Sequence, residues 1–152
     1  MATATRKRPP QAISAALASH FVRPAAMDWA PTRFPGIDAK VLMRDDERGI
    51  MTALFRWAPG ASLPDHLHAD IEQTYVLEGH LVDKDGAAAG IEARAGEFVW
   101  REPGSRHSAW APEGGIMLAV FQVPNKFFET DGRVTDPTGK IWDEAWGHTG
   151  KG

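Results

Sequence analysis

Two histidines, His66 and His68, stand two residues apart in the segment SLPDHLHAD, where the pattern predicts an extended strand. Side chains alternate between the faces of a strand, so both imidazoles are expected to point to the same side. Glu72 follows after a short turn, and His107 comes one hairpin later within PGSRHSAW. Three imidazoles and one carboxylate suit a divalent ion such as Fe, Mn, Ni or Zn. We therefore predict a metal site formed by His66, His68, Glu72 and His107.

The same residues admit a second interpretation, because a lone His-x-His pair is often only two surface side chains. The additional candidate ligands, and the glycines on both sides of the segment, favour the metal site. A carboxylate at Glu72 could be a ligand, or it could orient an imidazole from behind. The other histidines, His20, His80 and His148, receive no role, and we expect His80 to face solvent at the start of a strand.

The composition limits the class of protein. The 152 residues suffice for one compact domain, and 43% of them are hydrophobic, which is typical of a globular chain. A formal charge of -3 gives no reason to expect nucleic acid or a membrane surface as a partner. No segment approaches the ~20 apolar residues of a membrane span, so we expect a cytoplasmic protein. Because the chain has no cysteine, a metal must be held by nitrogen and oxygen.

Short strands separated by turn signals follow one another from residue 39 onward, which predicts an all-β sandwich or jelly-roll barrel. The stretch 51–58 is apolar at nearly every position and predicts a strand buried on both faces, with one face on the barrel core and the other on a second sheet or subunit. The expected strands are 39–44, 49–58, 62–68, 72–78, 80–84, 88–94, 97–101, 107–111, 116–123 and 126–129.

We predict three parts of the chain: an N-terminal tail and arm over 1–35, a barrel over 36–130, and a C-terminal arm or short helix over 131–152. Residues 13–20 could form a short helix, and prolines then keep the arm extended. The arm carries apolar residues that need burial on the barrel or on a partner subunit. The C-terminal part has helical spacing of its apolar residues. These apolar residues are Phe21, Val22, Met27, Trp29 and Phe34 in the arm, and Ile141, Trp142, Ala145 and Trp146 in the C-terminal part.

These motifs resemble the cupin superfamily. Its first motif, G-x5-H-x-H-x3-E-x6-G, is filled without a gap, whereas its second, G-x5-P-x-G-x2-H-x3-N, has Glu102 at the proline place and Ala111 at the asparagine place. The resemblance covers about residues 39 to 124. It implies the cupin double-stranded β-helix, a jelly-roll barrel that is commonly a dimer. The matching residues are Gly60, His66, His68, Glu72 and Gly79 in the first motif, and Gly96, Gly104 and His107 in the second.

Within the cupins, the stretches EQTYVLEGHLVDKDG and AGEFVWREPGSRHSAW resemble the cupin domain of ChrR-type anti-sigma factors and the small proteins grouped with them. A ChrR-type protein carries a separate helical domain that binds the sigma factor. The chain offers no room for one before residue 20, so we expect the metal-binding barrel without that partnership.

The layout also resembles the small dioxygenases that cleave acetylacetone or 2,4'-dihydroxyacetophenone, in chain length, the PGAS turn and the tail FF-x-x-DG-x-V. That resemblance implies Fe(II) held by three histidines. Glu72 departs from it, because a carboxylate at ligand spacing would change the charge of the metal and its open positions.

Alternation along the strands predicts which residues line a pocket around the metal. Thr74 and Val76 share the face of Glu72, and Ala109 shares that of His107. Ordinary barrel core is the competing interpretation for the aromatic residues. For Arg56 and Arg101 the pattern favours an outward-facing surface position over a role as a clamp for an anionic or carbonyl substrate. We expect Tyr75 to point away from the metal. The full predicted pocket is Phe55, Arg56, Thr74, Val76, Phe98, Trp100, Ala109 and Phe121.

Three hypotheses of function remain from the sequence. The first is a metal-dependent enzyme, a dioxygenase acting on a small dicarbonyl or hydroxyketone, with one divalent ion per chain; Fe(II) is favoured, and Zn, Mn or Ni is possible. The second is a non-catalytic sensor or binding barrel with structural Zn, and a weaker third is an isomerase or decarboxylase. We expect a small-molecule ligand and a homodimer, and neither nucleic acid nor a membrane as a partner.

Overall fold

The described part of the chain is built almost entirely from β-strands. The structure is a computed structural model, and it describes residues 18–122 and 126–135. One 3-10 turn, η2 (Pro24–Ala26), precedes the strands. The strands are β1 (Ala30–Pro31), β2 (Ile37–Asp45), β3 (Ile50–Trp57), β4 (Ala61–Leu67), β5 (Glu72–Asp83), β6 (Glu92–Arg94), β7 (Phe98–Arg101), β8 (Arg106–Ala111), β9 (Gly115–Gln122), β10 (Lys126–Phe128) and β11 (Val134–Thr135).

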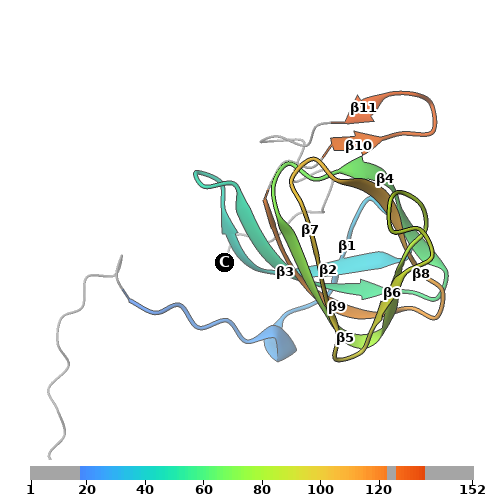
Figure 1. The fold of residues 1–152 in the computed structure, drawn as a ribbon. Coiled ribbons are helices and arrows are strands. Elements are labelled where there is room, and N and C mark those ends of the chain that lie inside the picture. Colours follow the sequence, from blue (N-terminus) through green and yellow to red (C-terminus); the bar gives the residue numbers. More distant parts are fainter. Residues whose placement is uncertain (1–17, 123–125, 136–152) are drawn as a thin grey trace, which may run out of the picture.

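The strands form a strongly curled antiparallel sheet, which confirms the all-β jelly roll (Figure 1). One half runs β1-β2-β3-β9-β5, and the other runs β5-β8-β4-β10-β11. Strand β5 belongs to both halves. Its first part pairs with β7 and β9, and its last part pairs with β6 and β8. The two halves therefore close around one interior and share a single long strand.

Gly79 lies in β5 where the strand passes from one half to the other. Its φ is +70°, a left-handed conformation that side chains other than glycine rarely adopt. A Cβ at this position would lie 2.1 Å from the carbonyl oxygen of Gly114. The last glycine of the first motif therefore permits both the bend in β5 and the close approach of the neighbouring chain.

Alternation along the strands separates the interior from the outside. In β3, Met51, Ala53, Phe55 and Trp57 are buried, and the residues between them are half-buried or exposed. The prediction that this strand is buried on both faces is therefore wrong for the single chain. Its side chains follow the period-two pattern of a sheet with one face on the core.

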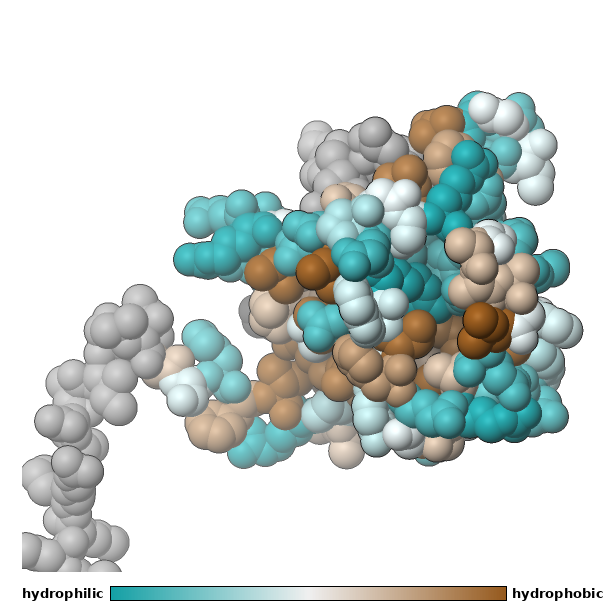
Figure 2. Space-filling model, viewed as in Figure 1, coloured by the Kyte–Doolittle hydropathy of each residue, from teal (hydrophilic) through white to brown (hydrophobic). Residues whose placement is uncertain are grey.

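The N-terminal arm contacts the barrel through Trp29. The ammonium of Lys40 lies 4.6 Å from the centre of the Trp29 ring, and the Arg56 guanidinium lies 4.7 Å from it. Lys40 also donates a hydrogen bond to the Pro24 carbonyl at 2.7 Å. On the N-terminal side of η2 the arm extends away from the barrel (Figures 1 and 2), and Phe21 is 79% exposed.

The predicted elements differ from the observed ones in a few places. The expected strands 72–78 and 80–84 are one strand, and only 92–94 of the expected strand 88–94 is extended. Most of the expected helix 13–20 and all of the expected C-terminal helix lie outside the described residues. No helix in the described ranges has the length and apolar character of a membrane span.

We expect Gly79→Ala to lower the free energy of unfolding well beyond the cost of a positive φ alone. Gly90→Ala is the matched control, because Gly90 has a φ of +82° but a Cβ there would have no other atom within 4 Å. The control should cost about 1–2 kcal/mol, the usual penalty of the left-handed region. Urea unfolding monitored by tryptophan fluorescence would measure both. Equal losses for the two variants would contradict the steric explanation.

Candidate metal centre

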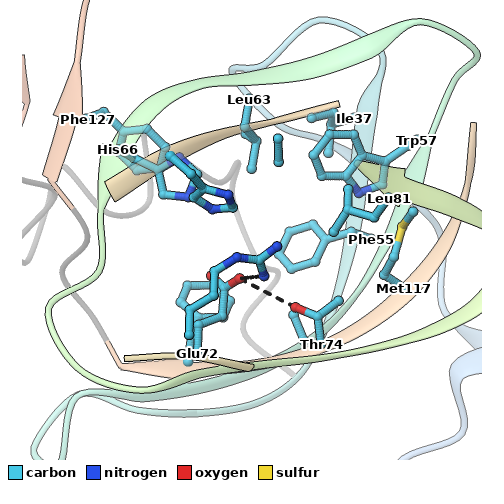
Figure 3. Close-up of a pocket in the computed structure, with 15 residues that line it drawn as sticks. Ile37, Phe55, Trp57, Leu63, His66, Glu72, Thr74, Leu81, Met117 and Phe127 are labelled. Atoms are coloured by element: carbon cyan, nitrogen blue, oxygen red, sulfur yellow. Dashed lines mark hydrogen bonds and ion pairs between the residues drawn. The ribbon is translucent and has the colours of Figure 1, made fainter. Parts of the chain in front are cut away.

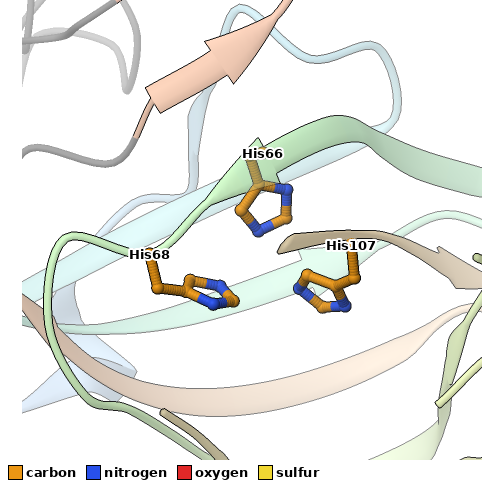
Figure 4. A group of neighbouring side chains, drawn as sticks. All are labelled: His66, His68 and His107. Atoms are coloured by element: carbon orange, nitrogen blue, oxygen red, sulfur yellow. The ribbon is translucent and has the colours of Figure 1, made fainter. Parts of the chain in front are cut away.

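Three buried imidazoles meet inside the barrel. His66 comes from β4 and His107 from the adjacent strand β8, where the two residues are directly opposite one another. His68 follows the end of β4. One nitrogen from each ring lies within 4.8 Å of the other two, and the three residues are only 0–5% exposed (Figure 4). The pairing of β4 with β8 thus brings together residues 41 apart in the sequence.

A bulge in β4 sets the direction of the first histidine. The register between β4 and β8 shifts between Leu63 and His66, so extra backbone is accommodated at Pro64 and Asp65. Bulges of this kind re-aim the side chains that follow them. The carbonyl of Pro64 then lies 2.8 Å from Nδ1 of His66 and holds the ring.

Each of the three rings is held through its Nδ1 atom. Besides the contact of His66 with Pro64, Nδ1 of His68 lies 2.9 Å from the Ser105 hydroxyl. Nδ1 of His107 lies 2.9 Å from Oδ1 of Asp83. A carbonyl and an ionised carboxylate can only accept, so Nδ1 carries the proton in His66 and His107. Their Nε2 atoms consequently present a lone pair, whereas the Ser105 hydroxyl permits either tautomer of His68.

Two of the Nε2 atoms lack a hydrogen bond in the described part of the chain. They belong to His68 and His107, although Nε2 of His68 has an ion-pair contact with Oε2 of Glu72 at 3.2 Å. A buried nitrogen that has lost water without gaining a partner destabilises the fold by about 1–3 kcal/mol. Ordinary core histidines satisfy both ring nitrogens. The arrangement is instead that of metal ligands, which are oriented by hydrogen bonds at the far nitrogen.

Glu72 lies beside this cluster and is not one of the three residues whose ligand atoms lie within 4.8 Å of one another. Its Oε2 is 3.2 Å from Nε2 of His68, and its Oε1 accepts a hydrogen bond from Arg101 at 3.0 Å. Burial raises the pKa of Glu72, but contacts with His68 and the Arg101 charge outweigh burial and hold that pKa far below its ordinary value. Glu72 is therefore a half-buried anion with one oxygen directed at His68.

Arg101 connects Glu72 to the residue that holds His107. Its side chain is buried, and its second terminal nitrogen donates to Oδ1 of Asp83 at 2.6 Å. Burial raises the pKa of Asp83, but the hydrogen bond with His107 and the Arg101 charge lower it further than burial raises it. One guanidinium thus positions two carboxylates, and each of these contacts a different histidine of the cluster.

A small cavity adjoins the histidines and extends into the barrel (Figure 3). The space open to the centre of a water-sized molecule is about 40 Å³, where a single water needs roughly 10–15 Å³. Its polar lining is His66, His107, Glu72, Thr74 and Arg101. The rest is apolar: Ile37, Phe55, Trp57, Leu63, Leu81, Ala109, Met117, Ala119, Phe121 and Phe127.

The structure brings part of the predicted pocket together. Phe55, Thr74, Ala109 and Phe121 line the cavity, and Val76 is fully buried without lining it. Arg56, Phe98 and Trp100 do not, so their prediction as pocket residues is wrong. Each lies on the outward side of its strand: Arg56 pairs with Asp38 at the surface, and the two aromatic residues are 53% exposed.

The sequence interpretation missed Arg101, Asp83 and His80. An outward position was favoured for Arg101, yet it is inward because Trp100 takes the outward side of β7. His80 is only 6% exposed within the continuous strand β5, so the expectation that it faces solvent is wrong. The expected outward direction of Tyr75 is confirmed by its 41% exposure. Strict alternation from Trp100 was the one signal that could have found Arg101.

The metal-free protein is expected to lose stability in mild acid. Burial, together with the neighbouring His107, lowers the pKa of His66 from 6.5 to about 4. The unfolded chain therefore takes up this proton near pH 6.5, and the folded chain takes it up only near pH 4. The contribution of neutral His66 to the free energy of unfolding is fully present above pH 6.5 and is lost as the pH falls to 4. This contribution is at most about 3 kcal/mol.

Urea unfolding in a chelator at pH 7 and at pH 4.5 would measure this loss. His66→Gln is the control, since it removes the titrating ring and should flatten the pH dependence in this window. A native chain equally stable at both pH values would contradict the buried, neutral state of His66.

Comparison with known proteins supports the fold and shows the family. Residues 17–126 match the family described as the ChrR cupin-like domain. No curated protein matches the chain. The structure of Rhodobacter sphaeroides SigE in complex with the anti-sigma ChrR is similar with a TM-score of 0.53, at 24% identity over 66% of this chain and 51% of that chain.

Two similar solved structures extend over nearly the whole chain. A protein assigned as an acetylacetone dioxygenase from Methylibium petroleiphilum PM1 is 25% identical over 89% of this chain and 99% of that chain, with a TM-score of 0.72. An acetylacetone dioxygenase from Acinetobacter johnsonii is 22% identical over 99% of this chain and 100% of that chain, with a TM-score of 0.75. The family match covers well over half of the chain and contains all three histidines, so this protein belongs to the ChrR cupin-like domain family.

Proposed function

We propose that this protein is a metal-dependent cupin enzyme of the dioxygenase kind, acting on a small dicarbonyl or hydroxyketone. The observation that supports it best is the set of three buried imidazoles that converge beside a small cavity, with Nε2 of His68 and of His107 lacking a hydrogen bond. The similarity to acetylacetone dioxygenases supports the choice of substrate class. A bound divalent ion, with Fe(II) favoured over Zn, Mn or Ni, would supply Lewis acidity toward two substrate oxygens and a site for O₂ chemistry.

The histidines, Glu72 and the apolar walls have separate roles in this proposal. His66, His68 and His107 hold the ion through Nε2, and their Nδ1 contacts keep the rings in place. Glu72 turns Oε2 toward the centre while Arg101 retains Oε1, so it completes the shell or supplies a negative charge at its edge. The apolar walls, including Phe55 and Phe121, exclude water from the carbonyl carbons of the substrate.

Arg101 is the one cationic side chain in the lining of the cavity, and it already contacts Glu72 and Asp83, so it has no free charge to offer an anion. A substrate with a carboxylate would therefore depend on the bound divalent ion for its counter-charge.

A non-catalytic barrel with structural Zn is the second candidate. Its support is Glu72, because an oxygen 3.2 Å from a ligating nitrogen has the spacing of a fourth ligand that would close a tetrahedral Zn shell. The two functions differ in whether a coordination position stays open for a substrate.

Metal analysis followed by O₂ uptake tests the proposed function. We expect about one divalent ion per chain, and O₂ consumption with acetylacetone after loading with Fe(II) under anaerobic conditions. Asp83→Asn should weaken metal affinity about 10- to 100-fold, because it loosens the contact that holds His107. Asp65→Asn is the matched control, since Asp65 forms only a surface ion pair with Arg106 beside the cluster.

Tightly bound Zn, with no uptake from a panel of diketones and hydroxyketones under Fe(II), would eliminate the enzyme and favour the structural site. Equal metal affinity in the two Asn variants would contradict the role assigned to Asp83.

We also propose that the protein is a homodimer. Tyr75, Leu77 and Trp100 are each 41–53% exposed and lie on the paired strands β5 and β7. The exposed Phe21 and Val22 of the arm are a second apolar surface on the same chain. Contiguous exposed apolar surface is typical of protein–protein contacts, and a second copy would cover both.

Light scattering during gel filtration would test the dimer. The full chain should have twice the mass of one chain, and Trp100→Glu should shift it toward the monomer. Deleting residues before 36 would measure the contribution of the arm. A monomeric full chain at micromolar concentration would refute the proposal.

A further inference from the structure

A second, larger cavity lies on the outer side of the wall that bounds the metal cavity. It opens between β6 and β7, where these strands pair with different halves of β5. By the same measure as the inner cavity its free space is about 450 Å³, which is within the usual size of small-molecule sites. We call this cavity the outer groove. It is lined by residues of β5, β6 and β7, by Ala88 and Ile91 of the loop before β6, and by Glu97 just before β7.

Arg101 forms much of the wall between the two cavities. Together with Leu81 it lines both of them. Its guanidinium donates to Glu72, which lines the inner cavity, and to Asp83, which lines the outer groove. The two cavities are therefore separated by the side chains of Arg101 and Leu81 and by the two ion pairs of Arg101.

One hydrogen-bond donor of Arg101 is unsatisfied in the position that separates the two cavities. Its Nε atom is buried and has no hydrogen-bond partner in the described protein. An unmet buried donor raises the free energy of the state that contains it. Rotation of this side chain toward the groove would expose Nε to water, which offsets part of the cost of separating the ion pairs.

We propose that the outer groove is the site through which small uncharged carbonyl compounds reach the metal cavity, and that the Arg101 side chain is its movable wall. The identity of the compound rests on the proposed function, but the route does not. The groove is lined by apolar Ile91, Phe98 and Val99 and by three carboxylates. The latter belong to Asp83, Glu92 and Glu97, and they disfavour anions.

A single introduced thiol can measure access to the inner cavity, because the chain has no cysteine of its own. Thr74→Cys places the thiol in the lining of the inner cavity, at a residue only 3% exposed. Val76→Cys is the control on the same face of β5; Val76 is 0% exposed and lines neither cavity, so it reports reaction through local unfolding. The rates of alkylation by uncharged iodoacetamide and by the anion iodoacetate would be followed by mass spectrometry.

Two further substitutions then block or open the proposed route in the Thr74→Cys background. Ala88→Trp fills the outer groove, whereas Ala87→Trp places the same bulk on an exposed neighbour that lines neither cavity. Arg101→Met removes the ion pairs of the wall. We expect Ala88→Trp to slow iodoacetamide about tenfold, Ala87→Trp to leave the rate unchanged, and Arg101→Met to raise it severalfold.

Iodoacetamide should also react faster than iodoacetate by more than their intrinsic ratio toward a free thiol. The route is wrong if the two Trp variants react alike, or if Thr74→Cys is no faster than Val76→Cys. An unchanged rate in Arg101→Met would refute the movable wall. None of these rates requires a metal or turnover, so failure of the diketone reaction would leave this test intact.

Discussion

The rest of the site depends on buried imidazole nitrogens at the centre of the barrel, whose lone pairs need a partner that accepts an electron pair. Three imidazoles are buried there, and at least two carry an Nε2 lone pair because a strictly accepting oxygen fixes the proton on Nδ1. Protonation does not easily satisfy Nε2 of His66, since burial and the neighbouring imidazoles lower the pKa of this ring. A divalent cation satisfies all three atoms at once, so the arrangement is stable as a metal site and costly without one.

The fold supplies this geometry with a small number of devices. The bulge in β4 aims His66, and direct pairing of β4 with β8 places His107 opposite it. The shared strand β5 carries Glu72 at its start and Asp83 at its end, and Arg101 of β7 joins the two. The orientation of the ligands is thereby coupled to the wall of the cavity, because the same guanidinium holds both carboxylates and separates the inner cavity from the outer groove.

Spacing alone predicted the fold and the three histidines, because period-two alternation and the glycine positions are local properties of the chain. It also placed Thr74 on the face of Glu72. Local rules failed where the answer depended on strand register and on partners distant in sequence. Phe98 and Trp100 are large and aromatic, as many core residues are, yet they lie on the outer side of β7. Because side chains alternate along the strand, Arg101 lies on the inner side.

The burial of Arg101 could not be predicted from the residue itself, because a buried arginine requires partners. Those partners, Glu72 and Asp83, lie 29 and 18 residues away. His80 was misassigned for a related reason. A glycine before it suggested the start of a strand, whereas Gly79 is a bend inside one continuous strand.

The most direct test of the central claim is the anomalous scattering of crystals grown from protein purified without chelator, recorded on both sides of the absorption edge of the metal found by elemental analysis. One peak is expected inside the barrel, about 2.0–2.2 Å from Nε2 of each of His66, His68 and His107. A barrel with no peak at that point, or with the three Nε2 atoms bonded only to ordered water, would contradict it.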